Sequence, residues 1–235
     1  MKIALLGYGK MGKIIERIAL ERGHEIVLRK GSENSFEGLE KADVAIDFSI
    51  PTSAVVNIKS AIDYHVPIIS GTTGWLEQYD DIVAYNQLKG GAFLYGSNFS
   101  LGVNVFFKLN EYLAKMMSQL KEYNVSMEEI HHTQKLDAPS GTAISLANGI
   151  IENSAYNKWT LDQPKENEIH IDAIRQDSVP GTHSVFYDSS IDQIEIKHTA
   201  HSREGFALGA VVAAEWILGK KGVFTMRDVL NLNDN

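Results

Sequence analysis

The sequence predicts an α/β fold made of a Rossmann-like, doubly wound parallel sheet and an inserted α+β domain with a mixed sheet. Two observations lead to this prediction. Up to residue 96, short apolar segments alternate with segments of helical periodicity, which is typical of a parallel sheet covered on both faces. Beyond residue 120 the strand-like segments follow one another with one clear helix among them, which indicates a separate mixed or antiparallel sheet.

The first half of the chain supplies the strands and helices of the parallel sheet. Ile14, Ile15, Ile18 and Ala19 fall on one stripe of a helix that follows the first apolar segment. Further helices are expected between several of the later segments. The predicted strands are 2–6, 24–28, 43–48, 66–70 and 92–96, and the predicted helices are 13–23, 52–64 and 76–88.

The second half changes pattern and then returns to the first sheet. The polar segment 152–165 is expected to be an exposed, mobile loop. Residues 205–219 are apolar on nearly every side, so they predict a buried helix packed on the first sheet. We therefore expect a dinucleotide-binding domain from 1–101 and 203–235 and a second domain from 102–202. Within the second domain, helices are expected at 101–120 and 141–151, and strands at 123–131, 168–175, 182–187 and 193–201.

Charge and composition exclude several classes of partner. The chain has 22 basic and 30 acidic residues, a net charge of -8, which repels phosphate backbones and anionic membranes. Nucleic acid and membrane surfaces are therefore not expected as partners. The chain has no cysteine and no spanning apolar run, and its first strand begins beside Met1 with no signal peptide. We expect a cytoplasmic protein.

A glycine pattern joins the first predicted strand to the first predicted helix. Gly7 permits a tight turn, Gly9 lets a pyrophosphate approach the backbone, and Gly12 lets the helix pack closely on the strand. The N-terminus of the helix also presents N–H groups to phosphate. The alternative is an ordinary glycine-rich turn, but the strand–turn–helix context favours dinucleotide binding.

The second predicted strand ends in two cations where an NAD-selective site usually carries an acid. Arg29 and Lys30 suit the 2′-phosphate of NADPH better than the 2′-hydroxyl of NADH. A solvated pair of surface charges is an equal alternative for these residues in isolation. The preceding glycine pattern favours the phosphorylated cofactor.

The later strands of the first half end in small and hydroxyl residues. These ends are Asp47 to Ser49, Gly71 to Gly74 and Gly96 to Ser100. Ligands of such sheets bind beyond the carboxyl ends of the strands, so a ribose and a flat ring are expected to lie there. Ordinary turn chemistry is the alternative for each end alone.

One stretch of the second domain crowds several reactive groups together. His131 and His132 end a strand, Lys135 follows in a loop, and Ser140 opens a helix whose first turn contains Gly141 and Thr142. The N–H groups of that turn form an anion site, the lysine is a mobile cation, and a histidine titrates near neutrality. A small carboxylate substrate that must be held and protonated fits this set. The alternative is a capped helix with surface histidines.

No metal is expected at this stretch. Adjacent residues of a strand point to opposite faces, so His131 and His132 do not readily chelate one ion.

These motifs together resemble the 4-hydroxy-tetrahydrodipicolinate reductase family, also called dihydrodipicolinate reductase, of the diaminopimelate and lysine pathway. The resemblance runs essentially from end to end, and the long "EIHHTQKLDAPSGTA" element is highly specific. The other segments that carry it are "GYGKMG", "DFS", "GTTG", "SNFSLGVNVF", "VPGTHSVFY", "HTAHSREGFALGA" and "MRDVLNLN".

The resemblance implies roles for individual residues. His131 would donate or accept a proton, Lys135 would donate the proton, and His132, Ser140, Gly141 and Thr142 would bind the substrate. NADPH or NADH would be the cofactor, and the second domain would join a homotetramer through its sheet. The implied cofactor-binding residues are Gly7, Tyr8, Gly9, Lys10, Met11, Gly12, Gly71, Thr72, Thr73, Gly96, Ser97, Asn98 and Phe99, beside Arg29 and Lys30.

The chain departs from the family pattern in the adenosine half of the cofactor site. Its glycine loop is one residue shorter than usual, and the segment 31–42 is abbreviated. Two alternatives remain: another Rossmann-type dehydrogenase acting on aspartate or diaminopimelate, and a nucleotide-binding regulator without catalysis. The expected reaction is hydride transfer from nicotinamide to an unsaturated, nitrogen-containing ring dicarboxylate, followed by protonation.

Overall fold

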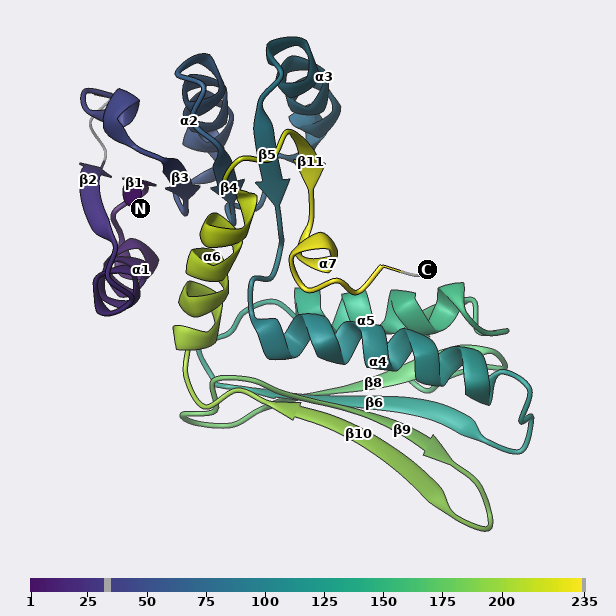
Figure 1. Cartoon of the computed structure of the whole chain (residues 1–235). Coiled ribbons are helices and arrows are strands. Elements are labelled where there is room, and N and C mark those ends of the chain that lie inside the picture. Colours follow the sequence, from purple (N-terminus) through teal and green to yellow (C-terminus); the bar gives the residue numbers. More distant parts are fainter. Residues whose placement is uncertain (32–34, 234–235) are drawn as a thin grey trace. The chain divides into compact units, whose positions relative to one another are not determined.

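The computed structural model describes residues 1–31 and 35–233, and it divides the chain into two compact units (Figure 1). Unit 1 comprises Met1–Leu101 and Glu204–Asn235, and unit 2 comprises Gly102–Arg203. The abbreviated segment 31–42 is described only in part, because residues 32–34 lie outside the described residues. Among the described residues no helix combines the length and apolar character needed to cross a bilayer.

Unit 1 is a doubly wound parallel sheet, which confirms the predicted Rossmann-like fold. Its six strands have the order β11-β5-β4-β3-β1-β2, and every pair is parallel. The strands are β1 (Lys2–Leu6), β2 (Glu25–Lys30), β3 (Val44–Asp47), β4 (Ile68–Ser70), β5 (Ala92–Tyr95) and β11 (Gly222–Phe224). The helices are α1 (Lys10–Glu21), α2 (Pro51–Asp63), α3 (Tyr79–Lys89), α6 (Glu204–Ile217) and α7 (Met226–Val229), with short 3-10 turns at Leu39–Lys41 and Leu76–Gln78.

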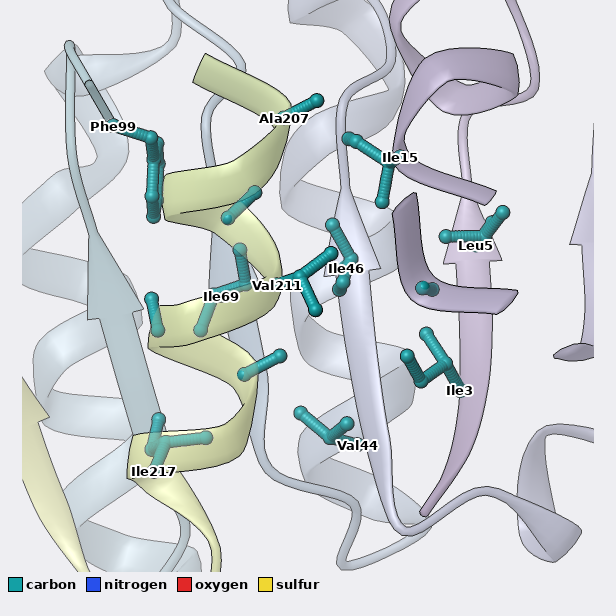
Figure 2. Close-up of a cluster of buried hydrophobic side chains, with 14 of the residues drawn as sticks. Ile3, Leu5, Ile15, Val44, Ile46, Ile69, Phe99, Ala207, Val211 and Ile217 are labelled. Atoms are coloured by element: carbon teal, nitrogen blue, oxygen red, sulfur yellow. The ribbon is translucent and has the colours of Figure 1, made fainter. Parts of the chain in front are cut away.

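The strands of unit 1 are apolar on both faces because helices cover both faces. In β1, Ile3 and Leu5 point into a cluster with α1 and α6, while Ala4 and Leu6 point into a second cluster with α2. Figure 2 shows the first cluster, in which Val211 of α6 lies among the strand residues. The alternating side chains of β1 therefore contribute to the hydrophobic cluster on each face of the sheet.

Unit 2 is a five-stranded mixed sheet with helices on one face, as expected for the inserted domain. Its strand order is β10-β9-β6-β8-β7, with β9 antiparallel to both neighbours and the other pairs parallel. Both helices lie on one face of the sheet (Figure 1). Their side chains share one hydrophobic core with the strands. The helices are α4 (Leu101–Met117) and α5 (Gly141–Glu152), and the strands are β6 (Asn124–His131), β7 (Lys158–Thr160), β8 (Glu168–Arg175), β9 (Thr182–Asp188) and β10 (Gln193–Thr199).

The prediction of a continuous loop over 152–165 is wrong. The segment contains the edge strand β7, which pairs with β8 and packs Trp159 against the core of unit 2. Three residues are too few for a periodic pattern, so pairing with a neighbour decides this strand. The same reason explains why β11, another strand of three residues, was not predicted.

We expect Gly209 to be indispensable for the packing of α6. A Cβ at Gly209 would lie 1.7 Å from the carbonyl oxygen of Phe99, which cannot move without shifting the backbone. Replacement by alanine should lower the free energy of unfolding, measured in urea, by about 3 kcal/mol or more. The matched control is Gly205→Ala, where the nearest atom lies 3.5 Å away and the change should stay within about 1 kcal/mol. Equal stability of the two variants would mean that α6 shifts freely.

Candidate active-site residues on the two units

The glycine loop of unit 1 fits a dinucleotide phosphate. Gly7 has φ +116°, and a Cβ there would lie 2.2 Å from the carbonyl oxygen of Phe48. A Cβ at Gly12 would lie 2.3 Å from the carbonyl oxygen of Gly7, whereas one at Gly9 would meet no atom within 4 Å. Gly9 precedes α1 without a side-chain cap, and the first turn carries no acid. The loop therefore combines close packing with an open approach to the N-terminus of the helix.

The structure separates the two cations at the end of β2. Arg29 donates hydrogen bonds to Glu16, which also accepts one from Tyr8 of the glycine loop. The hydrogen bond from Arg29 holds the pKa of Glu16 below its usual value. Lys30 is buried, and its Nζ lies 4.9 Å from the centroid of the Phe36 ring. The cations therefore do not form the joint exposed pair that the sequence suggested, because neighbouring strand residues point to opposite faces.

A pocket of about 330 Å³ lies beside the end of β2. Its walls include Arg29, Lys30 and Lys41, and one acid, Glu37. Among the lining residues that the structure describes, cations therefore outnumber acids, which suits a phosphate group.

Asp47 organises the ends of β3 and β4. Its buried carboxylate accepts hydrogen bonds from Ser49 Oγ at 2.7 Å, Asn57 Nδ2 at 2.8 Å, Ser70 Oγ at 2.8 Å and Thr72 Oγ1 at 2.8 Å. Burial raises the pKa of Asp47, and these hydrogen bonds act in the opposite direction. The carboxylate thereby fixes Thr72, one of the predicted cofactor-binding residues.

The other predicted cofactor-binding residues differ in exposure. Thr73, Ser97 and Lys10 are exposed, while Tyr8, Met11, Gly71, Gly96 and Asn98 are partly buried. Phe99 is 1% exposed and its ring lies 5.5 Å from that of Phe48, so it belongs to the core. A Cβ at Gly71 would lie 2.3 Å from the same Phe48 ring. Phe99 and Gly71, which the sequence grouped as cofactor contacts, therefore contribute to the packing around the Phe48 ring at the strand ends.

Unit 2 contains a buried carboxylate beside two histidines. Glu129 and His131 lie on the helix-covered face of β6, and Glu129 pairs across the strands with His183 of β9. His131 Nδ1 and His183 Nε2 lie 3.5 Å and 3.6 Å from Glu129 Oε2. A Cβ at Gly181 would lie 3.1 Å from His131 Nε2, so glycine leaves room for the imidazole.

The N-terminus of α5 contacts the carboxylate of Glu129. The backbone N–H of Ser140 donates to both oxygens of Glu129, at 3.1 Å and 3.0 Å. Ser140 Oγ accepts from the N–H of Ala143 and lies 3.0 Å from His183 Nε2. Ser140 is thus a buried cap whose polar groups contact protein atoms, whereas a Cβ at Gly141 would meet no atom within 4 Å. Open space at the helix N-terminus begins at Gly141.

Lys135 is less mobile than the sequence suggested. Its Nζ lies 2.8 Å from each carboxylate oxygen of Asp137. The guanidinium of Arg175 donates to the carbonyl oxygens of Lys135 at 3.3 Å and Asp137 at 2.6 Å, and also to Glu129 Oε1 at 3.2 Å. His132, on the opposite side of the strand from His131, donates its backbone N–H to the carbonyl oxygen of Val179.

The carboxylate of Glu129 stays ionised although it is buried. Burial by itself would raise its pKa, but interactions with His183 and with Ser140 outweigh that effect and lower the pKa to about 2. A buried carboxylate with several donors is best stabilised in its charged form.

His131 does not titrate near neutrality in this structure. Burial, reinforced by electrostatic interactions with His183, Lys135 and Arg175, lowers its pKa to about 4, although Glu129 acts in the opposite direction. His131 is therefore neutral at pH 7.

The sequence interpretation missed Glu129, Arg175 and His183 as site residues. A signal was present, because Val125, Met127 and Glu129 alternate along β6 and place a carboxylate where a core residue belongs. The ligand atoms of Glu129, His131 and His183 lie within 4.8 Å of one another, a spacing that could hold a metal ion. Since the carboxylate already accepts hydrogen bonds from Ser140 and Arg175, we interpret the cluster as a hydrogen-bond network.

Together these features define a class. A Rossmann-like unit with a phosphate-binding glycine loop, and a second unit with a lysine, histidines and an open helix N-terminus, are typical of nicotinamide-dependent oxidoreductases acting on small anionic substrates.

Comparison with known proteins gives the family. The model for the N-terminus of dihydrodipicolinate reductase matches residues 1–99, and the model for its C-terminus matches residues 102–230. The chain belongs to the dihydrodipicolinate reductase family. A 4-hydroxy-tetrahydrodipicolinate reductase of Christiangramia forsetii is 55% identical over 98% of both chains. One of Methanosarcina barkeri is 36% identical over 96% of this chain and 83% of the relative.

Solved structures agree in fold. A dipicolinate-bound dihydrodipicolinate reductase from Paenisporosarcina sp. TG-14 has a TM-score of 0.75 at 22% identity, covering 96% of this chain and 97% of that one. An aspartate dehydrogenase from Thermotoga maritima has a TM-score of 0.51 at 14% identity, covering 95% and 99%. The family models separate these two enzymes, because both halves of this chain match dihydrodipicolinate reductase.

The lowered pKa values predict a loss of stability in acid. Between pH 6.5 and about 4 the unfolded chain protonates His131 while the folded chain does not, so the free energy of unfolding falls as the pH falls. Glu129 adds a further loss between pH 4.5 and about 2, because its folded-state pKa is the lower one. His131→Gln should remove about 1–3 kcal/mol of the first loss.

Urea unfolding of both proteins at intervals from pH 8 to pH 4 measures this difference. The two curves should run parallel above pH 7, which serves as the internal control. Curves that stay parallel down to pH 4 would show that His131 is not held neutral by the fold.

Proposed function

We propose that this chain reduces 4-hydroxy-tetrahydrodipicolinate to tetrahydrodipicolinate, with loss of the 4-hydroxyl group as water, a step of diaminopimelate and lysine biosynthesis. The observation that carries the proposal is the grouping of His131, Lys135 and the open N-terminus of α5 within one unit, in a chain that also has a dinucleotide-type glycine loop. Membership of the dihydrodipicolinate reductase family and the 55% identical relative support the same reaction.

NADPH or NADH supplies the hydride when bound. Gly7 to Gly12 would hold the pyrophosphate, and Thr72, Thr73, Ser97 and Asn98 would line the nicotinamide half, supported by their positions after β4 and β5. NADPH is the proposed preference, because Arg29 and the pocket around it offer cations to a 2′-phosphate. Arg29 would then leave or share its contact with Glu16.

Substrate binding and protonation are assigned to unit 2. One carboxylate would lie against the N–H groups of Gly141 and Thr142, with His132 as a further contact. Lys135 would exchange Asp137 for the substrate and deliver the proton to the reduced ring. His131, neutral at pH 7, would orient that lysine. The dipicolinate-bound relative supports a planar dicarboxylate as the ligand type.

A homotetramer and a cytoplasmic location complete the proposal. The sheet face opposite the helices carries Ile130, Ile174 and Phe186, each partly exposed, which would suit assembly through this sheet. The net charge of -8 supports neither nucleic acid nor an anionic membrane as a partner.

The reaction is tested by making the substrate from pyruvate and aspartate semialdehyde with its synthase and then adding this protein with NADPH. We expect the absorbance of the reduced cofactor to fall at a rate proportional to the amount of protein. A parallel assay with aspartate or diaminopimelate and the oxidised cofactor tests the other dehydrogenases. Cofactor binding without any turnover would favour the non-catalytic regulator.

Variants should separate proton transfer from substrate binding. Lys135→Ala and His131→Gln should each lower kcat by about 10²- to 10⁴-fold, with a smaller change in KM, because they remove proton transfer. Thr142→Val and His132→Gln should raise KM more than they lower kcat, because they remove ground-state contacts to a carboxylate.

Steady-state kinetics on the four variants, each checked for intact folding by circular dichroism, measure this split. Near wild-type kcat in both Lys135→Ala and His131→Gln would place the acid elsewhere.

Arg29→Gln should weaken NADPH more than NADH. Removing the guanidinium deletes a partner of the 2′-phosphate that NADH does not have. We expect the KM for NADPH to rise about tenfold, and the KM for NADH to stay within about threefold. Arg17→Gln is the control, because Arg17 pairs with Glu21 of α1 and Glu204 of α6 and does not line the pocket beside β2. An unchanged ratio of the two KM values would remove Arg29 from the cofactor site.

A further inference from the structure

We propose that Arg175, anchored on the buried carboxylate of Glu129, is a positioning residue that holds the loop carrying Lys135 for proton delivery. The inference rests on the function proposed above and adds a residue that acts through the lysine.

The anchor of Arg175 is the buried carboxylate of Glu129, whose charge needs nearby donors. Glu129 is 0% exposed and occupies the core-facing side of β6, where Val125 and Met127 precede it. Burying an ionised carboxylate is costly unless charged and polar donors surround it. The backbone N–H of Ser140 donates a hydrogen bond to the carboxylate of Glu129, and Arg175 provides the positive charge beside it. The same contact fixes the guanidinium in space.

The fixed guanidinium reaches the loop at two points. Its Nη2 donates to the carbonyl oxygen of Asp137 at 2.6 Å, and its Nε donates to the carbonyl oxygen of Lys135 at 3.3 Å. These two carbonyls lie on either side of Leu136. Because Lys135 and Asp137 also form the ion pair of the loop, Arg175 holds the backbone of both partners.

The loop has few buried side chains to hold it. Thr133, Gln134, Leu136 and Asp137 are exposed, and Leu136 is 96% exposed. A segment without buried apolar side chains opens easily unless hydrogen bonds retain it. The backbone N–H of Lys135 donates to the carbonyl oxygen of His132, which gives one local turn. The start of the loop is tied to the segment after β8, because Thr133 Oγ1 donates to Asp177 at 2.8 Å and the N–H of His132 donates to the carbonyl oxygen of Val179. Arg175, which extends from the end of β8, is the link that holds the part from Lys135 to Asp137.

Arginine is required for this geometry. The planar guanidinium presents donors in several directions at once, so one side chain can bond Glu129 and both carbonyl oxygens. A lysine would preserve the charge beside Glu129 but offers a single nitrogen. The conservative substitution therefore removes the clamp while leaving the buried carboxylate paired.

Two variants and one control test the proposal. Arg175→Lys keeps the buried charge pair and removes the fork. The double variant Glu129→Met with Arg175→Met removes both charges together, which avoids an unpaired buried charge, while the N–H of Ser140 loses its acceptor. The control is Lys158→Gln, because Lys158 forms an ion pair with Glu168 at the opposite end of the same strand, β8. Thermal unfolding confirms that each variant is folded before it is assayed.

The kinetic readout is the split between kcat and KM in the reduction of the synthase-generated substrate. We expect Arg175→Lys and the double variant to lower kcat by about 10- to 100-fold, because a misplaced acid slows chemistry, while the KM for NADPH stays within about threefold. Lys158→Gln should keep the wild-type kcat. A wild-type kcat in either Arg175 variant would overturn the proposal.

Trypsin cleavage after Lys135 gives a readout that does not depend on the reaction. The bond between Lys135 and the exposed Leu136 is cut when the loop opens, and mass spectrometry measures its rate under native conditions. We expect both Arg175 variants to be cut there about tenfold faster than the wild type, and Lys158→Gln at the wild-type rate. Wild-type protection in Arg175→Lys would overturn the proposal even if kcat falls.

The two readouts also separate this inference from the proposed function. If the wild type fails to reduce the substrate but Arg175→Lys loses protection at Lys135, the loop clamp stands and the reaction is wrong. If the wild type reduces the substrate and Arg175→Lys keeps both its kcat and its protection, the function stands and the clamp is wrong.

Discussion

A carboxylate buried at the end of a strand must be surrounded by donors, and much of the candidate site follows from satisfying two such groups. Asp47 gathers hydroxyl and amide donors from β3, α2, β4 and the turn after β4, and Glu129 gathers the start of α5, β8 and β9. An unpaired buried charge would cost several kcal/mol. In each unit, the hydrogen bonds that stabilise the buried carboxylate in the folded state therefore also hold the polar residues at the strand ends in place.

The electrostatics of unit 2 show how local charge can oppose net charge. The chain carries -8 overall, yet His183, Lys135 and Arg175 surround His131 closely enough to depress its pKa. Glu129 pulls in the other direction, and burial decides the result because it also disfavours the imidazolium. His131 is therefore a neutral imidazole at pH 7, placed beside Lys135 and Arg175.

Both cations that the proposed reaction needs already form ion pairs within the protein. Arg29 is paired with Glu16, and Lys135 with Asp137. Such partly exposed pairs are worth about 0–1 kcal/mol each, so a phosphate or a dicarboxylate can displace them at small cost. The free protein thus keeps these side chains ordered without sequestering them.

The sequence by itself determined the fold class, the order of the units and the family, because these depend on periodicity and on contiguous motifs. The alternation of β1 to β5 with helices and the element from Glu129 to Ala143 are both visible along the chain. Tertiary structure alone decided which side chains meet. Strand pairing brought Arg175 and His183 to Glu129, burial removed Lys30 and Phe99 from the open surface, and pairing with β8 made a strand of Lys158–Thr160. Such contacts join residues far apart in sequence, and a local pattern cannot encode the neighbours that strand pairing and burial supply.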